Sequence, residues 1–145
     1  MDIYNSLGGL IAKTKWYSNN YIKKVFQENN IDISYTQWKL IITINQKPGL
    51  TQTELSKSAQ KDKASVTRML DILEKEDYVT RKKDPEDRRL YNIFLTEKGE
   101  AVFKKTLPLV NRVESDMLQD LTEEEVEIMK RCLVQICDRT RKILH

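Results

Sequence analysis

The sequence predicts a mainly α fold that carries one small β-hairpin. Three observations support this prediction. Apolar residues recur at helical spacing over most of the 145 residues, and several Thr/Ser–x–x–Glu/Gln pairs mark helix starts. Alternating strand patterns flank a single charged loop after residue 77. Because this hairpin follows two short helices joined by a tight turn, the order is typical of a winged helix-turn-helix.

The two short helices are predicted on either side of a turn at Gln60 and Lys61. Thr51 with Glu54 has capping-box spacing at the start of the first helix. Asp62 is a suitable N-cap for the second, because its carboxylate can accept a bond from a first-turn amide. The second helix has an apolar stripe that is predicted to be buried: Val66, Met69, Leu70, Ile72 and Leu73.

The opposite face of the second helix is a candidate DNA-reading surface. Its first two turns carry polar, non-acidic side chains, and a recognition helix contacts base edges mainly from its N-terminal residues. The candidate residues for the major groove are Lys63, Ser65, Thr67 and Arg68. The alternative is an ordinary solvated helix face, since exposed helix faces are usually charged.

The hairpin is predicted from two short strand patterns and the loop between them: Tyr78–Arg81, Lys82–Arg89 and Tyr91–Leu95. Arg88 and Arg89 stand near the loop end, and adjacent arginines suit the narrow, negative minor groove. Asp87 is expected to brace this wing by holding a guanidinium in a two-pronged salt bridge. The alternative is a simple hairpin loop, where Asp-Pro and charged residues are common.

The run ASVTRMLDILEKEDYVTRKKDPEDRRLYNIFLTEKGE resembles the signature of the MarR family, named for multiple antibiotic resistance regulators. The Asp-x-Arg wing motif of the family falls on Asp87 and Arg89, followed by a Leu-Thr pair and Gly99. One departure is Asp77, where the family usually has Gly between helix and strand; Asp tolerates the left-handed conformation at modest cost. The resemblance covers nearly the whole chain.

The resemblance implies a transcription regulator that binds double-stranded DNA as a homodimer, most often as a repressor. It also implies a small aromatic or phenolic effector, bound near the junction of the first helices and the winged module. The aromatic residues that could form such a pocket are Trp16, Tyr17, Tyr21 and Trp38. The alternative for these side chains is the hydrophobic core.

The helices outside the winged module are predicted to form a dimerisation region. Residues 1–30 and 97–145 make up this region, and residues 31–96 make up the winged helix-turn-helix, as one continuous unit. Pro108 is expected to kink the helix that follows the hairpin. The last helix has a near-heptad seam: Val126, Met129, Leu133, Ile136, Thr140, Ile143 and Leu144. The alternative is that these helices pack only within one chain.

Composition limits the function classes. The net charge is only +3, and residues 51–95 contain ten Lys/Arg against nine Asp/Glu, so any positive surface must come from the placement of charges. No signal peptide or membrane span is evident, and a cytoplasmic protein is expected. Cys132 and Cys137 lack the further ligands of a zinc site and are expected to be buried structural thiols.

No catalytic constellation is present in the sequence, so we expect no enzyme activity, cofactor or metal. The single histidine, His145, stands at the C-terminus, where a disordered end is expected. The sequence therefore predicts a homodimeric winged-helix regulator that represses transcription from an inverted-repeat operator. The rival interpretation is a winged-helix module that docks a partner protein and does not bind DNA sequence-specifically.

Overall fold

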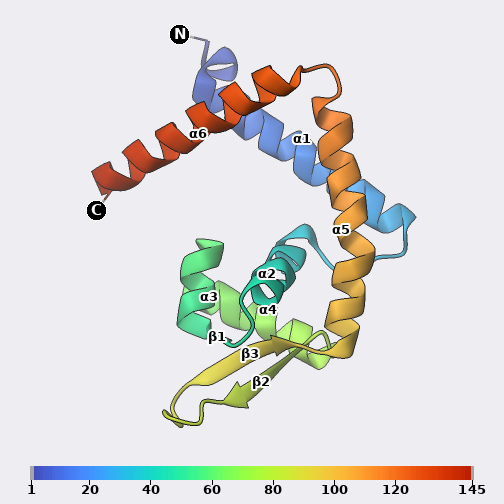
Figure 1. Cartoon of the computed structure of the whole chain (residues 1–145), viewed down its shortest axis with the longest axis vertical. Coiled ribbons are helices and arrows are strands. Elements are labelled where there is room, and N and C mark those ends of the chain that lie inside the picture. The colour runs from blue at the N-terminus through green and yellow to red at the C-terminus, as the bar shows by residue number, and fades with distance from the viewer. Residues whose placement is uncertain (1, 145) are drawn as a thin grey trace. The chain divides into compact units, whose positions relative to one another are not determined.

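The computed structural model describes residues 2–144, and this part of the chain forms α-helices and one small antiparallel sheet (Figure 1). The helices are α1 (Leu7–Glu28), α2 (Tyr35–Gln46), α3 (Gln52–Ala59), α4 (Lys63–Lys75), α5 (Glu97–Leu118) and α6 (Glu123–Leu144). The strands are β1 (Leu50–Thr51), β2 (Val79–Lys83) and β3 (Tyr91–Leu95). The predicted fold class is confirmed, and His145 lies outside the described residues.

The helix starts follow the predicted capping pattern. Ser34 opens α2 and Thr51 opens α3, each as a full capping box in which the residue at the third position bonds back to the cap. Asp62 caps α4 by accepting the amide of Ser65 at 2.8 Å. The first helix begins at Leu7, because Ser6 caps α1 and a separate 3-10 turn precedes it at Ile3–Asn5.

The chain divides into two compact units, one ending at Val110 and the other beginning at Asn111. The core of the first unit is apolar and draws on α1 to α4 and on the sheet. Its most buried side chains include Phe26, Leu40, Ile41, Ile44, Leu55, Val66, Leu70, Leu73 and Ile93. The second unit contains the end of α5 and all of α6. None of the described helices is long and apolar enough to cross a membrane.

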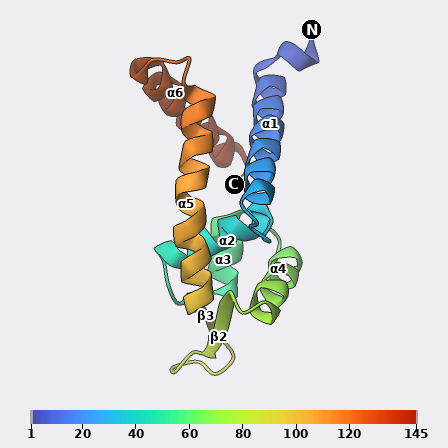
Figure 2. The ribbon, with the colours of Figure 1, turned by 90° about the vertical axis from the view of Figure 1, so that its right-hand side faces the viewer.

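The sheet has the strand order β1–β3–β2, with β3 in the middle. Strand β1 escapes prediction from the sequence, because two residues are too short to show an alternating pattern; it pairs Leu50 with Ile93 and Thr51 with Asn92. The β2–β3 hairpin extends beyond α3 and α4 in both views (Figures 1 and 2). It therefore has the position of a wing beside the helix pair.

Two contacts and one backbone turn fix the ends of the winged module. Gly99 in the first turn of α5 lies so near β2 that an added Cβ would stand 2.0 Å from the carbonyl oxygen of Tyr78. The main chain at Asp77 has φ 62°, as expected for the residue that replaces the family's Gly. Trp38 donates its indole N–H to the hydroxyl of Thr106 at 2.7 Å, which joins α2 to α5 inside the core.

Two burial predictions are wrong. The predicted buried stripe of α4 includes Ile72, but 44% of this residue is exposed. A 100° step per residue puts Ile72 about 130° around the helix from the centre of the stripe formed by Val66, Leu70 and Leu73, so its side chain lies outside the buried face. The expected burial of the two cysteines is also contradicted, because the thiols of Cys132 and Cys137 are both free and exposed on α6.

Helix α6 exposes the apolar residues of its predicted seam. Met129, Leu133 and Ile136 are each at least 36% accessible, and no residue of the helix is buried among those described. The N-terminal half of α1 is similar, since Leu7, Leu10 and Ile11 are also exposed. Pro108 stands inside α5, and the helix continues through it to Leu118.

Candidate nucleic-acid interface

The first turn of α4 presents a linked set of polar side chains. Asp62 accepts the hydroxyl of Ser65 at 2.7 Å, and Ser65 in turn accepts a guanidinium N–H of Arg68 at 3.1 Å. These bonds from Ser65 lower the pKa of the Asp62 carboxyl below its usual value, so it stays ionised as the cap of α4. Arg68 is thereby held against the helix start with its side chain exposed. Lys63 is also exposed and stands one residue after the cap.

Thr67 differs in its surroundings from Lys63, Ser65 and Arg68, the other residues predicted to contact the major groove. It is half-buried against α3, and its hydroxyl accepts an N–H from the side chain of Gln52. The same hydroxyl donates to the carbonyl of Lys63 at 2.8 Å. The structure thus brings Lys63, Ser65 and Arg68 to the exposed start of α4, while Thr67 also joins the two helices of the pair.

The wing loop is organised by Asp84, which sequence reasoning did not single out. One carboxylate oxygen accepts the amides of Glu86 and Asp87 at 2.8 and 2.9 Å, and the other accepts the side-chain amide of Asn92 at 2.9 Å. The bond from the Asp87 amide, followed by those from Asn92 and Glu86, lowers the pKa of Asp84. The signal was available in the sequence, because Asp before Pro commonly bonds to amides two and three residues on.

Asp87 does not hold a guanidinium in the predicted two-pronged salt bridge. Its carboxylate accepts the main-chain amide of Arg89 at 3.0 Å, and its carbonyl accepts the amide of Leu90 at 2.9 Å. The short turn explains the difference, because a carboxylate two residues before an amide reaches it more directly than the end of a long side chain. That Asp87 braces the wing therefore remains a prediction, and its basis is the bond from the main-chain amide of Arg89 to the Asp87 carboxylate.

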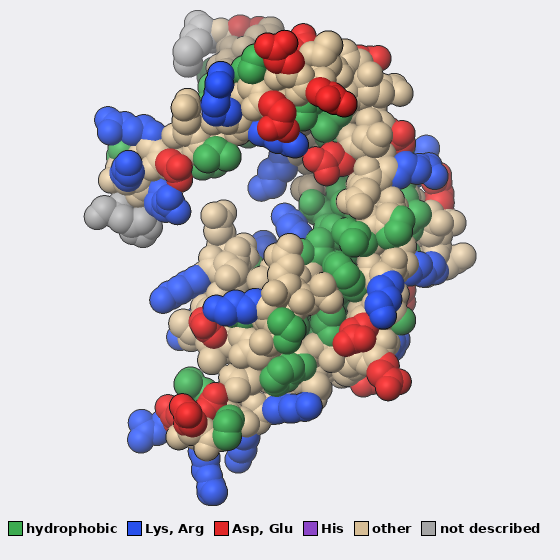
Figure 3. Space-filling model, viewed as in Figure 1, with side chains coloured by type: hydrophobic (Ala, Val, Ile, Leu, Met, Phe, Trp, Pro, Cys, Tyr) green, Lys and Arg blue, Asp and Glu red, His purple; other side chains and the backbone are tan. Residues whose placement is uncertain are grey.

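Arg88 and Arg89 are both exposed near the end of the wing loop. Within residues 2–144 neither guanidinium has an ion-pair partner. Figure 3 shows acidic and basic side chains close together at the lower end of the view, where the hairpin lies. The acidic side chains of this loop are occupied mainly with main-chain amides, so the two arginines stay available.

Arg81 on β2 ties the wing to α4, and this contact was also missed. Its guanidinium bonds Asp71 and Glu74 at 2.7 Å each, and its main-chain amide donates to Glu74 at 3.3 Å. The two acids are three residues apart, so they lie on one face of α4. Only 19% of the Arg81 side chain is exposed, and its buried Nε has no partner in the described part of the chain. A signal existed, because Asp71 lies on the polar face of α4 by helical spacing.

The four aromatic residues predicted to line a ligand pocket do not come together. Trp38 is a core residue, 4% exposed, with its ring near those of Phe26 and Tyr35. Trp16 and Tyr17 are exposed and contact each other edge to face, with ring centres 4.9 Å apart. Ten helical residues separate Trp16 from Phe26, about 15 Å along α1. The predicted grouping with Trp38 is therefore wrong, whereas Tyr21 is partly buried on α1.

In the described range, no group of three or more His, Cys, Asp or Glu side chains is placed to hold a metal ion. The start of α4 and the tip of the β2–β3 hairpin are both exposed. A helix pair with an exposed second helix and an adjacent hairpin defines a winged helix-turn-helix.

Comparisons with known proteins agree with this class. The sequence model of the MarR family matches residues 33–91, which include α2, α3, α4 and the hairpin up to Tyr91. An HTH-type transcriptional regulator of Bacillus anthracis, itself uncharacterised, is 29% identical over 147 residues, 95% of this chain and 94% of the relative. The transcriptional regulator HosA of Escherichia coli O111:H- is 29% identical over 114 residues, 74% of this chain and 84% of HosA.

Solved structures match the fold over almost the whole chain. A variant of MarR from E. coli, complexed with operator DNA, has a TM-score of 0.85 at 27% identity, covering 94% of this chain and 99% of MarR. The transcriptional repressor CouR, bound to a DNA duplex, has a TM-score of 0.86 at 22% identity, with 94% and 95% covered, which shows the fold. Residues 33–91 thus match the MarR family, and the chain is similar over nearly its whole length to transcriptional regulators of that family.

We predict that Arg81→Met lowers the free energy of unfolding by about 1–2 kcal/mol. The change removes two charge-assisted bonds, but both carboxylates are partly exposed, so the loss is smaller than for a buried pair. Urea denaturation measures it. Lys83→Met is the control, since Lys83 is exposed on the same strand and has no ion pair among the described residues. Equal stability of Arg81→Met and wild type would contradict the assigned role.

We predict that the wing loop loses its order in acid. Because the folded-state pKa of Asp84 is lowered, its bonds stabilise the loop above the unfolded pKa of about 3.9 and are lost as the pH falls through the folded pKa. Backbone ¹⁵N relaxation at Glu86 and Asp87 would report this change. At pH 7, Asp84→Ala should have the same effect and Glu86→Ala should not. A loop that stays ordered in Asp84→Ala would refute the prediction.

Proposed function

We propose that this chain is a homodimeric repressor that binds an inverted-repeat operator in double-stranded DNA. The observation that carries the proposal is the shared exposure of the α4 start and the wing loop, on two elements that the ion pairs of Arg81 with Asp71 and Glu74 join. Lys63, Ser65, Thr67 and Arg68 are the proposed contacts to the major groove. Arg88 and Arg89 are the proposed contacts of the wing. The related MarR structure with operator DNA supports this assignment.

The proposal gives the chain two functional regions. Residues 31–96 bind DNA, and residues 1–30 with 97–145 form the dimer. Helix α1 contributes to both, because its C-terminal residues Ile22, Val25 and Phe26 are buried in the first unit while its N-terminal apolar residues are exposed. Exposed apolar stripes on α1 and α6 support dimerisation, since large apolar patches of soluble proteins commonly mark interfaces.

Release from DNA by a small aromatic or phenolic effector is part of the same proposal. Trp38 is excluded from its binding site because it belongs to the core. The exposed pair Trp16 and Tyr17 remains as a proposed contact. A titration that follows Trp fluorescence in a Trp38→Phe background would test whether Trp16 senses such a molecule.

We predict that selected operators are inverted repeats with half-site centres about 10–10.5 bp apart, because a two-fold dimer places two recognition helices on one DNA face. Site selection with purified protein, followed by fluorescence anisotropy, measures the spacing and the affinity. The logarithm of the affinity should fall linearly with the logarithm of the salt concentration. Single asymmetric half-sites would refute the geometry. Absence of salt-dependent duplex binding would favour the rival protein-docking module.

We predict that Leu133→Glu with Ile136→Glu dissociates or unfolds the protein, because two charges enter the exposed apolar stripe of α6. Sedimentation at micromolar concentration and circular dichroism distinguish these two results. The matched control is Arg131→Glu with Gln135→Glu, which places two glutamates on the other face of α6 by helical spacing. A monomeric wild type with intact DNA binding would overturn the dimer.

A further inference from the structure

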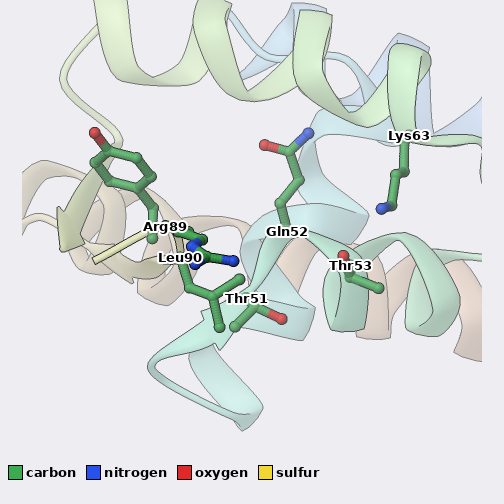
Figure 4. Close-up of a pocket in the computed structure, with 7 residues that line it drawn as sticks. Thr51, Gln52, Thr53, Lys63, Arg89 and Leu90 are labelled. Carbon is green, nitrogen blue, oxygen red and sulfur yellow. The ribbon is translucent and has the colours of Figure 1, made fainter. Parts of the chain in front are cut away.

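A hollow of about 210 Å³ lies where α3 begins, between α4 and the wing. Seven residues line this α3–wing hollow: Thr51, Gln52, Thr53, Lys63, Arg89, Leu90 and Tyr91. In Figure 4, the side chains of Arg89 and Lys63 enter from opposite sides, and Gln52 and Thr53 lie between them. The hollow thus joins three separate elements of the predicted DNA-binding surface.

The lining is cationic and rich in hydrogen-bond donors, and it contains no acidic residue. In the described part of the chain, neither Lys63 nor Arg89 has an ion-pair partner. The carboxylate nearest in sequence, Glu54, does not line the hollow; it accepts the amide and the hydroxyl of Thr51 at 2.9 and 3.0 Å. The hydroxyl of Thr53 is not engaged in this capping box. Two cations without ion pairs and the Thr53 hydroxyl therefore face the same space.

The walls of the hollow are held in place by other contacts. Pairing of Thr51 with Asn92 fixes the start of α3 against β3. The side chain of Gln52 bonds Thr67, which fixes α3 against α4. On the wing side, the main chain of Arg89 is held by the carboxylate of Asp87 at 3.0 Å. A small ligand would meet a surface that is already assembled, which lowers the cost of binding.

We propose that the α3–wing hollow seats a single oxyanion group of the phosphate class, held by Lys63, Arg89 and Thr53. The volume is below the roughly 300–1,000 Å³ of sites for drug-sized ligands, so it suits one small charged group. The proposal gives the adjacent residues Arg88 and Arg89 different roles. Arg89 grips an anion at the base of the wing, and Arg88, which does not line the hollow, remains available for the minor groove.

The oxyanion has two sources with the same chemistry. One is a backbone phosphate of the operator; this source rests on the proposed function. A phosphate bound there would contact α3, α4 and the wing together and so align them on the DNA. The other is a free phosphorylated small molecule, which would occupy Lys63 and Arg89 and so compete with DNA. Phosphate contacts orient a protein on DNA without specifying sequence.

The first experiment uses inorganic phosphate and the full chain without DNA. Amide signals of Thr53, Lys63 and Tyr91 should shift in a saturable manner in ¹H–¹⁵N spectra, whereas sodium chloride at equal ionic strength should not shift them. Lys63→Met and Arg89→Gln should each weaken phosphate binding about tenfold, as expected for a charge-assisted bond. Thr53→Val should weaken it less.

The controls remove the same charges outside the hollow. Arg88→Gln deletes the neighbouring guanidinium, and Lys57→Met deletes an exposed amine on α3 that does not line the hollow. Both should leave phosphate binding unchanged. Non-saturable shifts, equal shifts with chloride, or equal losses in the control variants would overturn the oxyanion seat. Unchanged folding of each variant is verified by circular dichroism.

The second experiment identifies the source with operator duplexes that carry one uncharged methylphosphonate at a time. If DNA supplies the group, one position in each half-site weakens binding by wild type but not by Lys63→Met with Arg89→Gln. The double variant should also lower the salt slope by about one unit per lost phosphate contact. If no position shows this coupling while phosphate still saturates the free protein, a free phosphorylated molecule is the occupant. Wild type that binds no duplex refutes the proposed function, and the first experiment still decides the seat.

Discussion

The ion pairs of Arg81 with Asp71 and Glu74 set the relation between the wing and the recognition helix. One side chain on β2 bonds two carboxylates on α4, and its main chain adds a third contact to Glu74. The buried side chains of Val79 and Ile93 anchor the base of the hairpin in the core, and the bonds of Arg81 extend this anchor to the exposed face of α4. Both elements would have to engage DNA together, so a fixed angle between them lowers the entropy lost on binding. The rest of the interface depends on this constraint.

The bonds made by the acidic side chains explain how residues 51–95, which are nearly neutral overall, present a cationic surface. Asp62 and Asp84 accept main-chain amides and neutral side chains, and these bonds lower the pKa of each. Asp71 and Glu74 are used by Arg81. These acids are thus directed to local bonds, whereas Lys63, Arg88 and Arg89 have no ion-pair partner among residues 2–144. Positive potential at the α3–wing hollow and the wing tip follows from this pairing, not from an excess of basic residues.

Helices α1 and α6 differ from the rest of the chain in where their apolar side chains lie. In the first unit the apolar faces of α2, α3 and α4 meet in one core, which removes them from water. The N-terminal half of α1 and the whole of α6 leave large apolar residues exposed. The proposed two-fold dimer would cover these stripes and link two winged modules. The exposed thiols of Cys132 and Cys137 belong to the same helix, and their roles depend on what covers it.

The sequence by itself determined the order of the helices, three capping boxes, the turn at Gln60 and the position of the hairpin, because helical periodicity and caps are local signals. It also pointed to Lys63, Arg68, Arg88 and Arg89 as exposed polar residues. Only the tertiary structure decided which side chains meet. Contacts between distant segments produce strand β1, the ion pairs of Arg81 with Asp71 and Glu74, the Gln52–Thr67 bond and the core position of Trp38. Such contacts depend on packing distances that periodicity does not encode, and this is why the sequence misplaces Trp38 and the two cysteines.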